Sequence, residues 1–134
     1  MLNALKAGIL YFGIVFLVGF LLGIVRILFL VPQFGETFAV LTEIPFILGA
    51  SWLVCGFVVR RLSVEAQFSS RLTMGVCAFG LLMIAEILLG VIGFGRTLDQ
   101  QLAAFVSEAG FLGLAGQILF GLFPVLRLFL FGDE

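Results

Sequence analysis

The 134-residue chain contains no histidine. Imidazole is the usual ligand of haem b and of most catalytic zinc sites, so we expect neither kind of site here. Cysteine is almost as scarce, and Cys55 and Cys77 do not have the spacing of an iron–sulfur or thiolate zinc site. Both cysteines fall in apolar stretches, where they are interpreted as small buried hydrophobes, with a redox pair as the alternative. The sequence therefore predicts no cofactor and no metal.

Charged residues are also few. They make up 11% of the chain and hydrophobic residues make up 63%, whereas soluble domains have about 25% and about 45–50%. A core built from so short a chain cannot bury this much apolar surface, but a lipid bilayer can cover it. The net charge of −1 gives no basic patch for nucleic acid. We predict an all-α integral membrane protein with one domain, residues 1–134.

Four apolar stretches are long enough to cross a bilayer, since about 20 helical residues at about 1.5 Å each span its hydrocarbon core. The predicted spans are residues 5–31, 38–59, 72–94 and 111–131. The first is too long for a signal peptide and lacks a small-residue cleavage site, so it is expected to be a retained helix. Pro45 lies inside the second span and predicts a kink or a late helix start.

The segment 98–109 differs from the spans. Thr97 and Gln100 have the spacing of a capping box. The apolar face of the segment carries Leu98, Leu102, Phe105 and Val106. The opposite face carries Asp99, Gln100, Gln101, Ser107 and Glu108, which indicates a short amphipathic helix lying in the membrane interface before the last span. The complete predicted fold is therefore four transmembrane helices in one bundle plus this interfacial helix.

Basic residues are distributed unevenly between the two predicted sides of the membrane. Four spans place both termini on one side, and Arg96 is the basic residue near the surface of the other. The termini side holds Lys6, Arg60, Arg61 and Arg71, with Arg127 able to reach it. The positive-inside rule then predicts cytoplasmic N and C termini. Arg60, Arg61 and Arg71 are interpreted as topology determinants, and an anionic lipid headgroup site is the alternative.

Each span carries one polar residue at a similar predicted depth. These residues are Arg26, Glu43, Glu86 and Gln117. Residue counts from the flanking charges place all four in the outer half of the bilayer. Because an unpaired charge facing acyl chains is costly, we expect them to form an intramembrane polar cluster. In this prediction Arg26 bridges Glu43, Glu86 or both, with Gln117 nearby.

Two acids and one arginine leave a surplus negative charge in the predicted cluster. Either one acid holds a proton, or a cation or water occupies the site. The simpler interpretation is a polar clasp that fixes helix register. The alternative is a site for a proton, a ligand or a lipid headgroup.

Glycines recur at helical spacing beside these polar residues. Small residues allow helices to approach closely in lipid, so we interpret them as helix-packing residues. The glycines concerned are Gly19, Gly23, Gly90, Gly93, Gly113 and Gly121.

The first half of the chain carries a recognisable pattern. It consists of G-x-x-x-G-x-x-R ending at Arg26, then Pro32, Gly35, Glu36, Glu43-x-Pro45, Ser51-Trp52 and Arg60-Arg61. This pattern resembles a family of small uncharacterised four-helix proteins of the bacterial inner membrane. The resemblance implies a bacterial cytoplasmic membrane, draws attention to Arg26 and Glu43, and implies no activity.

The sequence contains no paired-aspartate motif and no obvious Ser/Lys dyad, so we do not expect an intramembrane enzyme. We expect a non-catalytic accessory or stabilising subunit of a membrane assembly. Its partners would be the lipid bilayer and either other membrane-protein subunits or further copies of the chain. The alternative is a small proton- or cation-coupled transporter that uses Glu86 or Glu43.

Overall fold

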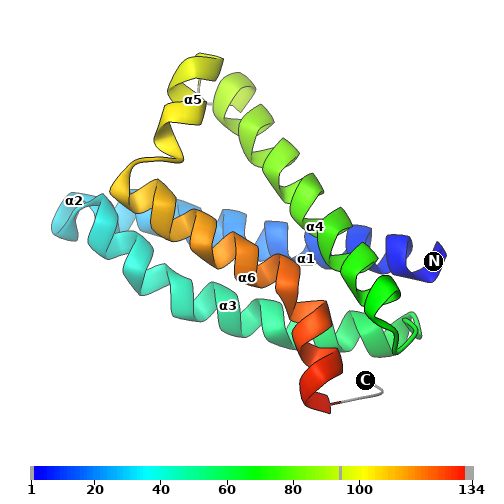
Figure 1. Cartoon of the computed structure of the whole chain (residues 1–134). Helices are drawn as coiled ribbons and strands as arrows, with labels where there is room; N and C mark the ends of the chain where they lie inside the picture. The colour runs from blue at the N-terminus through cyan, green and yellow to red at the C-terminus, as the bar shows by residue number, and fades with distance from the viewer. Residues whose placement is uncertain (1, 94, 132–134) are drawn as a thin grey trace.

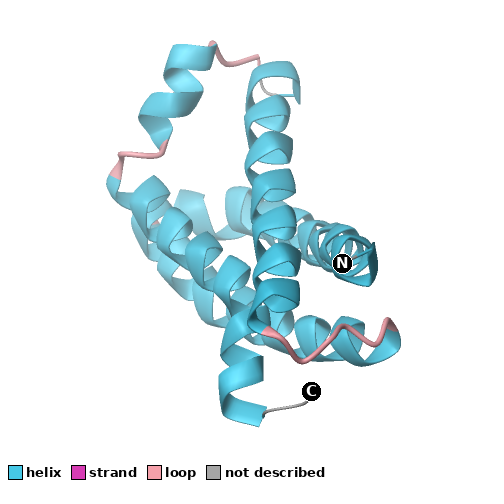
Figure 2. Ribbon diagram, turned by 45° about the vertical axis from the view of Figure 1, so that its right-hand side comes forward, coloured by secondary structure: helices cyan, strands magenta, loops and turns pink. Residues whose placement is uncertain are grey.

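The computed structural model describes residues 2–93 and 95–131. All regular secondary structure in these two ranges is helical (Figures 1 and 2). The elements are α1 (Leu2–Val25), the π-helical η1 (Arg26–Leu30), α2 (Val31–Phe34), α3 (Glu36–Arg61), α4 (Phe68–Leu88), the π-helical η2 (Leu89–Gly93), α5 (Leu98–Ala104) and α6 (Glu108–Phe131). Four continuous stretches are long and apolar enough to cross a membrane, as predicted. They are Leu2–Phe34, Glu36–Arg61, Phe68–Gly93 and Gly110–Phe131.

The first connection is shorter than predicted. The first long helix continues through η1 and α2, and the whole turn to α3 is made at Gly35, whose φ of +86° suits glycine. Pro32 lies in α2 directly after the π-helical η1, and its missing N–H removes one backbone hydrogen bond from this continuous helix. The prediction of a late start for the second span is wrong, because α3 begins at Glu36 and continues through Pro45.

The third and fourth long helices also begin earlier than predicted. Helix α4 starts at Phe68, which places Arg71 inside the helix rather than at its entrance. The capping box at Thr97 and Gln100 is confirmed, with both reciprocal hydrogen bonds present. The predicted interfacial helix is shorter than 98–109, because α5 ends at Ala104. Ser107 then starts α6 by accepting a hydrogen bond from the N–H of Gly110, as an N-cap residue does.

The long helices pack closely at the end of the molecule that holds both termini (Figure 1). Helix α4 packs against α1 and α6, and α3 packs against α1 and α6. Gly75 of α4 touches the backbone of α6, since a Cβ atom at Gly75 would lie 1.9 Å from the carbonyl oxygen of Gly121. A Cβ atom at Gly8 of α1 would lie 2.8 Å from the carbonyl oxygen of Met74 and 2.9 Å from Cβ of Cys77, both in α4. Glycine is therefore required where these helix backbones meet.

Two arginines are buried at this end and do not reach outward. Arg71 is 0% exposed, and its guanidinium donates to the backbone carbonyls of Glu65 (3.2 Å) and Pro124 (3.3 Å). Arg71 therefore cannot bind lipid headgroups, which corrects that part of the prediction. Arg127 donates twice to the carbonyl of Trp52 and lies 4.5 Å from the centre of its ring. It points inward instead of reaching toward the surface.

Arg60 and Arg61 are exposed at the C-terminal end of α3. Their role in topology or lipid binding stays a prediction. Neither Cys55 nor Cys77 takes part in a disulfide, and Cys55 is fully buried in the core, in line with the interpretation as a small hydrophobe.

Pro124 and Tyr11 form a complementary pair in the core. Proline at position 124 has no N–H, so the carbonyl of Phe120, one helical turn earlier in α6, loses its helical donor. The buried hydroxyl of Tyr11 in α1 supplies the missing hydrogen bond to Phe120 O at 2.7 Å. The rings of Tyr11 and Phe120 also stack with centroids 4.2 Å apart. Tyr11 of α1 thus replaces the backbone hydrogen bond that Pro124 removes from α6.

Replacing Tyr11 by phenylalanine should keep the ring stacking and remove only this hydrogen bond. We expect Tyr11→Phe to lower the free energy of unfolding in detergent by about 1–2 kcal/mol. The loss should be much smaller in a Pro124→Ala background, because the N–H of the new alanine can donate to Phe120. An equal loss in both backgrounds would show that the hydroxyl does not compensate for the proline.

Candidate functional site

A cavity of about 750 Å³ lies at the end of the molecule opposite the termini. There α4 diverges from α6, and α5 connects the two helix ends (Figure 1). Residues from all four long helices and from α5 line the cavity. All four residues of the predicted polar cluster, Arg26, Glu43, Glu86 and Gln117, are on its walls. The structure therefore brings the polar residues of the four long helices to one hollow.

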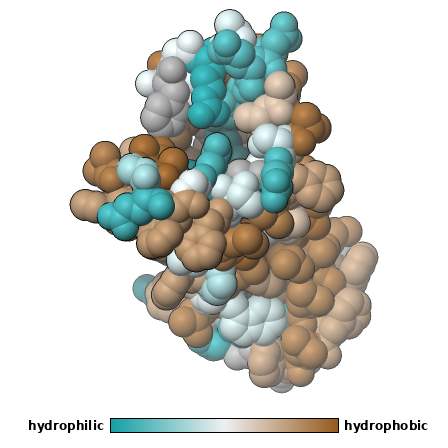
Figure 3. Space-filling model, turned by 90° about the vertical axis from the view of Figure 1, so that its left-hand side faces the viewer, coloured by the Kyte–Doolittle hydropathy of each residue, from teal (hydrophilic) through white to brown (hydrophobic). Residues whose placement is uncertain are grey.

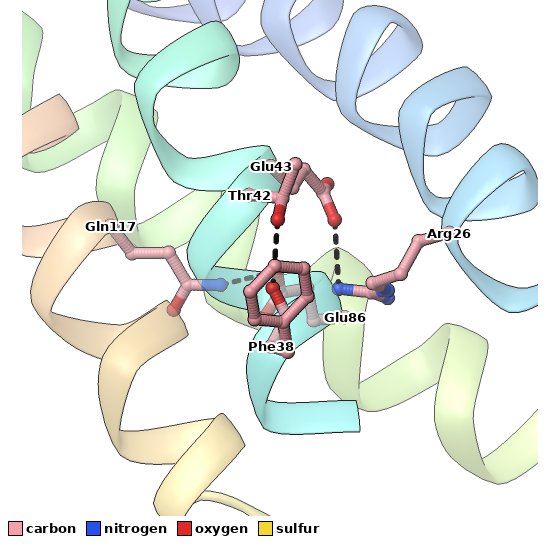
Figure 4. Close-up of polar contacts among 6 residues, drawn as sticks. All are labelled: Arg26, Phe38, Thr42, Glu43, Glu86 and Gln117. Atoms are coloured by element: carbon pink, nitrogen blue, oxygen red, sulfur yellow. Dashed lines mark hydrogen bonds and ion pairs between the residues drawn. The ribbon is translucent and has the colours of Figure 1, made fainter. Parts of the chain in front are cut away.

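Arg26 and Glu43 form an ion pair across α1–η1 and α3 (Figure 4). The guanidinium Nη1 lies 3.0 Å from the carboxylate oxygen Oε2, and the two side chains are 30% and 13% exposed. Arg26 is the first residue of η1, where the helix widens to a π-helical turn. Such turns are rare and often occur at functional sites. Of the two acids offered to Arg26 by the sequence, the structure pairs it with Glu43.

Glu86 forms a second, separate pair. The side-chain amide of Gln117 in α6 donates a short hydrogen bond to its carboxyl group (Figure 4). In the described part of the chain no ion pair joins Glu86 to a basic residue. The carbonyl oxygen Oε1 of Gln117 is buried and has no hydrogen-bond partner among the described residues. The surplus acid of the cluster is therefore Glu86, beside an amide with an unused acceptor.

Gln101 is a site residue that the sequence analysis assigned to the wrong face. Its side chain is 7% exposed, donates to the backbone carbonyl of Glu86 at 3.2 Å and accepts from Arg96 Nη1 at 3.1 Å. A Cβ atom at Gly90 would lie 1.9 Å from Gln101 Oε1, so glycine there leaves the room for this contact. The amphipathic pattern placed Gln101 toward water. The glycine one turn after Glu86 was the available sign of a close neighbour.

The predicted packing glycines divide into two groups. Gly121 meets the Cβ position of Phe79 at 3.1 Å, and Gly90 meets Gln101, so both lie at close contacts between elements. Gly19 has only an ordinary contact with Ile47, at 3.6 Å. The packing prediction is wrong for Gly23 and Gly93, whose nearest contacts are side chains of their own helix, and for Gly113, which has open space.

The absence of side chains has a different effect around the site. Gly19, Gly23 and Gly113 line the cavity, so their missing side chains help to form the hollow, whereas Gln101 occupies the space at Gly90. The closest helix contacts instead use glycines that the spacing argument did not select, Gly8 and Gly75, and Gly56 gives room to Arg127.

The cavity combines a few polar groups with a mainly apolar wall. Seen from this end, hydrophilic residues gather above and around a hollow in an otherwise largely apolar surface (Figure 3). Phe16, Phe20, Ile44 and Leu48 are among the apolar lining residues. Mostly apolar walls with a few convergent polar groups are typical of sites for small organic molecules.

The site carries no recognisable metal chemistry. No group of three histidine, cysteine, aspartate or glutamate side chains within residues 2–93 and 95–131 could hold a metal ion. Comparison of the chain with family models, with curated proteins and with solved structures finds no match. The resemblance to bacterial inner-membrane proteins therefore stays a prediction, and function has to be argued from the site itself.

The ion pair gives a direct test of the cluster. Arg26→Leu should lower the free energy of unfolding in detergent by about 1–3 kcal/mol, less than for a fully buried pair because Arg26 is partly exposed. Arg26→Leu combined with Glu43→Leu should cost less than Arg26→Leu alone, since the Glu43 carboxylate is no longer left without its counter-ion. The matched control, Arg26→Leu with Glu86→Leu, should give no such relief. If the Glu86 change reduces the loss of unfolding free energy and the Glu43 change does not, Arg26 pairs with Glu86 and not with Glu43.

Proposed function

We propose that the protein is a small proton- or cation-coupled membrane transporter in which Glu86 is the coupling acid. The observation that carries this proposal is the Glu86 carboxyl group on the cavity wall, with the amide of Gln117 as its side-chain partner. A carboxyl group with no fixed counter-charge can exchange a proton for another cation. Ionisable groups held inside membrane proteins are commonly such exchange sites.

The geometry favours Glu86 over Glu43 for this role. Glu43 already has a counter-ion in Arg26 at 3.0 Å, so binding a second cation there would compete with an existing ion pair. Glu86 has an uncharged partner. The two acids, which the sequence analysis could not rank, therefore have different proposed roles. Glu43 orients Arg26, and Glu86 binds the transported charge.

The accessory-subunit function predicted from composition needs neither a cavity nor an unpaired acid. A pure clasp would also be expected to close around its polar groups, whereas this cluster borders about 750 Å³ of space. Many large apolar side chains face outward, including Phe46 and Leu53. Lipid and a protein partner would cover this surface equally well, so it favours neither function.

The proposal includes a bundle of four spans in a bacterial cytoplasmic membrane with both termini in the cytoplasm. Arg71 and Arg127 are buried, but Lys6, Arg60 and Arg61 are exposed on the termini side, against Arg96 on the other. The charge bias that sets orientation is thus retained. The cavity then lies toward the outer face. An alkaline phosphatase fused to the C terminus would be inactive in this orientation and active in the opposite one.

Flux in liposomes tests the transport function. Liposomes containing the protein and a pH-sensitive dye are given a proton gradient and a cation gradient of opposite direction. Their proton gradient should dissipate faster than that of protein-free liposomes. Glu86→Gln should return the rate to that of protein-free liposomes, because the exchanging carboxyl is gone. Glu108→Gln removes the same charge at an exposed position outside the cavity lining and should leave the rate unchanged.

Two results would contradict the transporter. One is full flux in the Glu86→Gln variant. The other is no flux under any gradient from protein that co-purifies with one stoichiometric membrane partner, which would support the accessory subunit.

A further inference from the structure

Building on the proposed transport function, we infer that the cavity binds an organic ammonium ion, a primary or secondary amine on an apolar body. The inference names the chemical class of the cation that Glu86 would take. It rests on the size of the cavity, the hydrogen-bonding groups beside Glu86, the engagement of the nearby arginines and the nature of the walls.

The size of the cavity is that of a site for a small organic molecule. A water molecule takes about 30 Å³ of liquid volume, and sites for small organic ligands measure about 300–1,000 Å³. The volume of about 750 Å³ belongs to the second class. The described residues also offer no cluster of three metal ligands.

The polar groups on the cavity wall include two acceptor groups, the Glu86 carboxyl and the side-chain carbonyl of Gln117. The Glu86 carboxyl binds the Nε2 amide of Gln117, and the other end of the same amide, Oε1, is buried without a donor. An unused buried acceptor is unfavourable until a donor reaches it. A protonated amine with two or more N–H groups can donate to Glu86 and, once the Gln117 side chain turns to expose its buried Oε1, to Gln117 as well. A quaternary ammonium ion carries the charge but has no N–H to donate.

The charges on the cavity wall favour a cation over an anion. The lining carries three acids, Glu36, Glu43 and Glu86, against two basic residues, Arg26 and Arg96, and Arg26 is held by the Glu43 carboxylate. An anionic ligand would have to separate the Arg26–Glu43 pair and would then lie beside Glu86. A cation meets neither obstacle and neutralises the surplus acid.

The walls predict the rest of the ligand. Aliphatic side chains such as Ile44, Leu48 and Leu89 fit a hydrocarbon body. Phe16, Phe20 and Phe105 also line the cavity, and aromatic faces attract cations. Such an amphipathic ammonium ion has two sources, an aminolipid with its headgroup in the cavity or a free lipophilic amine.

The test uses the full chain in phosphatidylcholine nanodiscs and titration calorimetry, with protein-free nanodiscs as the blank. The probes are octylamine, octyltrimethylammonium and octanol, which share one apolar chain. Octylamine should bind about tenfold or more tightly than either of the others, because only it supplies both charge and N–H donors. Comparable binding of all three, or preference for the quaternary ion, would overturn the inference.

Two variants locate the binding. Glu86→Gln should weaken octylamine binding about tenfold or more, while Glu108→Gln should not. Gly113→Leu should abolish binding by filling the cavity, since a Cβ at Gly113 meets nothing within 4 Å. Gly13→Leu is the matched control at an equally open glycine outside the cavity lining. Octylamine binding that survives both Glu86→Gln and Gly113→Leu would place the ligand elsewhere.

Native mass spectrometry separates the two sources. Retained phosphatidylethanolamine that octylamine displaces identifies an aminolipid, and octylamine binding to lipid-free protein identifies a free amine. Both results support an ammonium site, whereas tight retention of phosphatidylglycerol in this cavity would contradict it. Selective amine binding without flux would leave the site in place and refute only transport. Flux without amine selectivity would leave the transport function in place and refute only the ammonium site.

Discussion

The backbone contact between Gly75 and Gly121 determines where α4 and α6 meet, and the cavity follows from it. With no side chain at Gly75, the two helices touch near the end that carries the termini. From this contact α4 runs away from α6 toward its other end, and α5 connects them there (Figure 1). Helices that touch at one end and diverge at the other enclose space. Three of the glycines on the divergent side, Gly19, Gly23 and Gly113, leave that space open.

The two ends of the molecule satisfy their polar groups differently. At the end that holds the termini, the closed end, Arg71 and Arg127 donate to backbone carbonyls, which cannot turn away as side chains can. At the end that holds the cavity, the open end, the partners of Glu43 and Glu86 are the side chains of Arg26 and Gln117, which can turn to other partners. The closed end is therefore suited to holding the fold, and the open end to exchanging one partner for a ligand.

The sequence could predict the four long apolar helices and the common level of Arg26 and Glu43 along them, because the length of an apolar run and residue counts along a helix determine both. It could not predict which acid pairs with Arg26, since that depends on helix rotation and crossing. Gly113 was predicted to be a packing residue for the same reason, because the spacing of glycines does not show what each one faces. Gln101 was missed because a polar residue on an amphipathic helix is normally assigned to water, whereas here it binds the backbone of α4.

The central claim is that the hollow beside Glu86 is open to polar molecules while the flanking helix surfaces meet lipid. A spin label on a cysteine at Gly113, in reconstituted protein with Cys55 and Cys77 replaced by alanine, tests it directly. We expect a water-soluble nickel complex to relax this label strongly. A label at the outward-facing Ile118 of the same helix should respond to oxygen instead. If the label at Gly113 is as inaccessible to the nickel complex as the label at Ile118, the cavity is closed and the account is wrong.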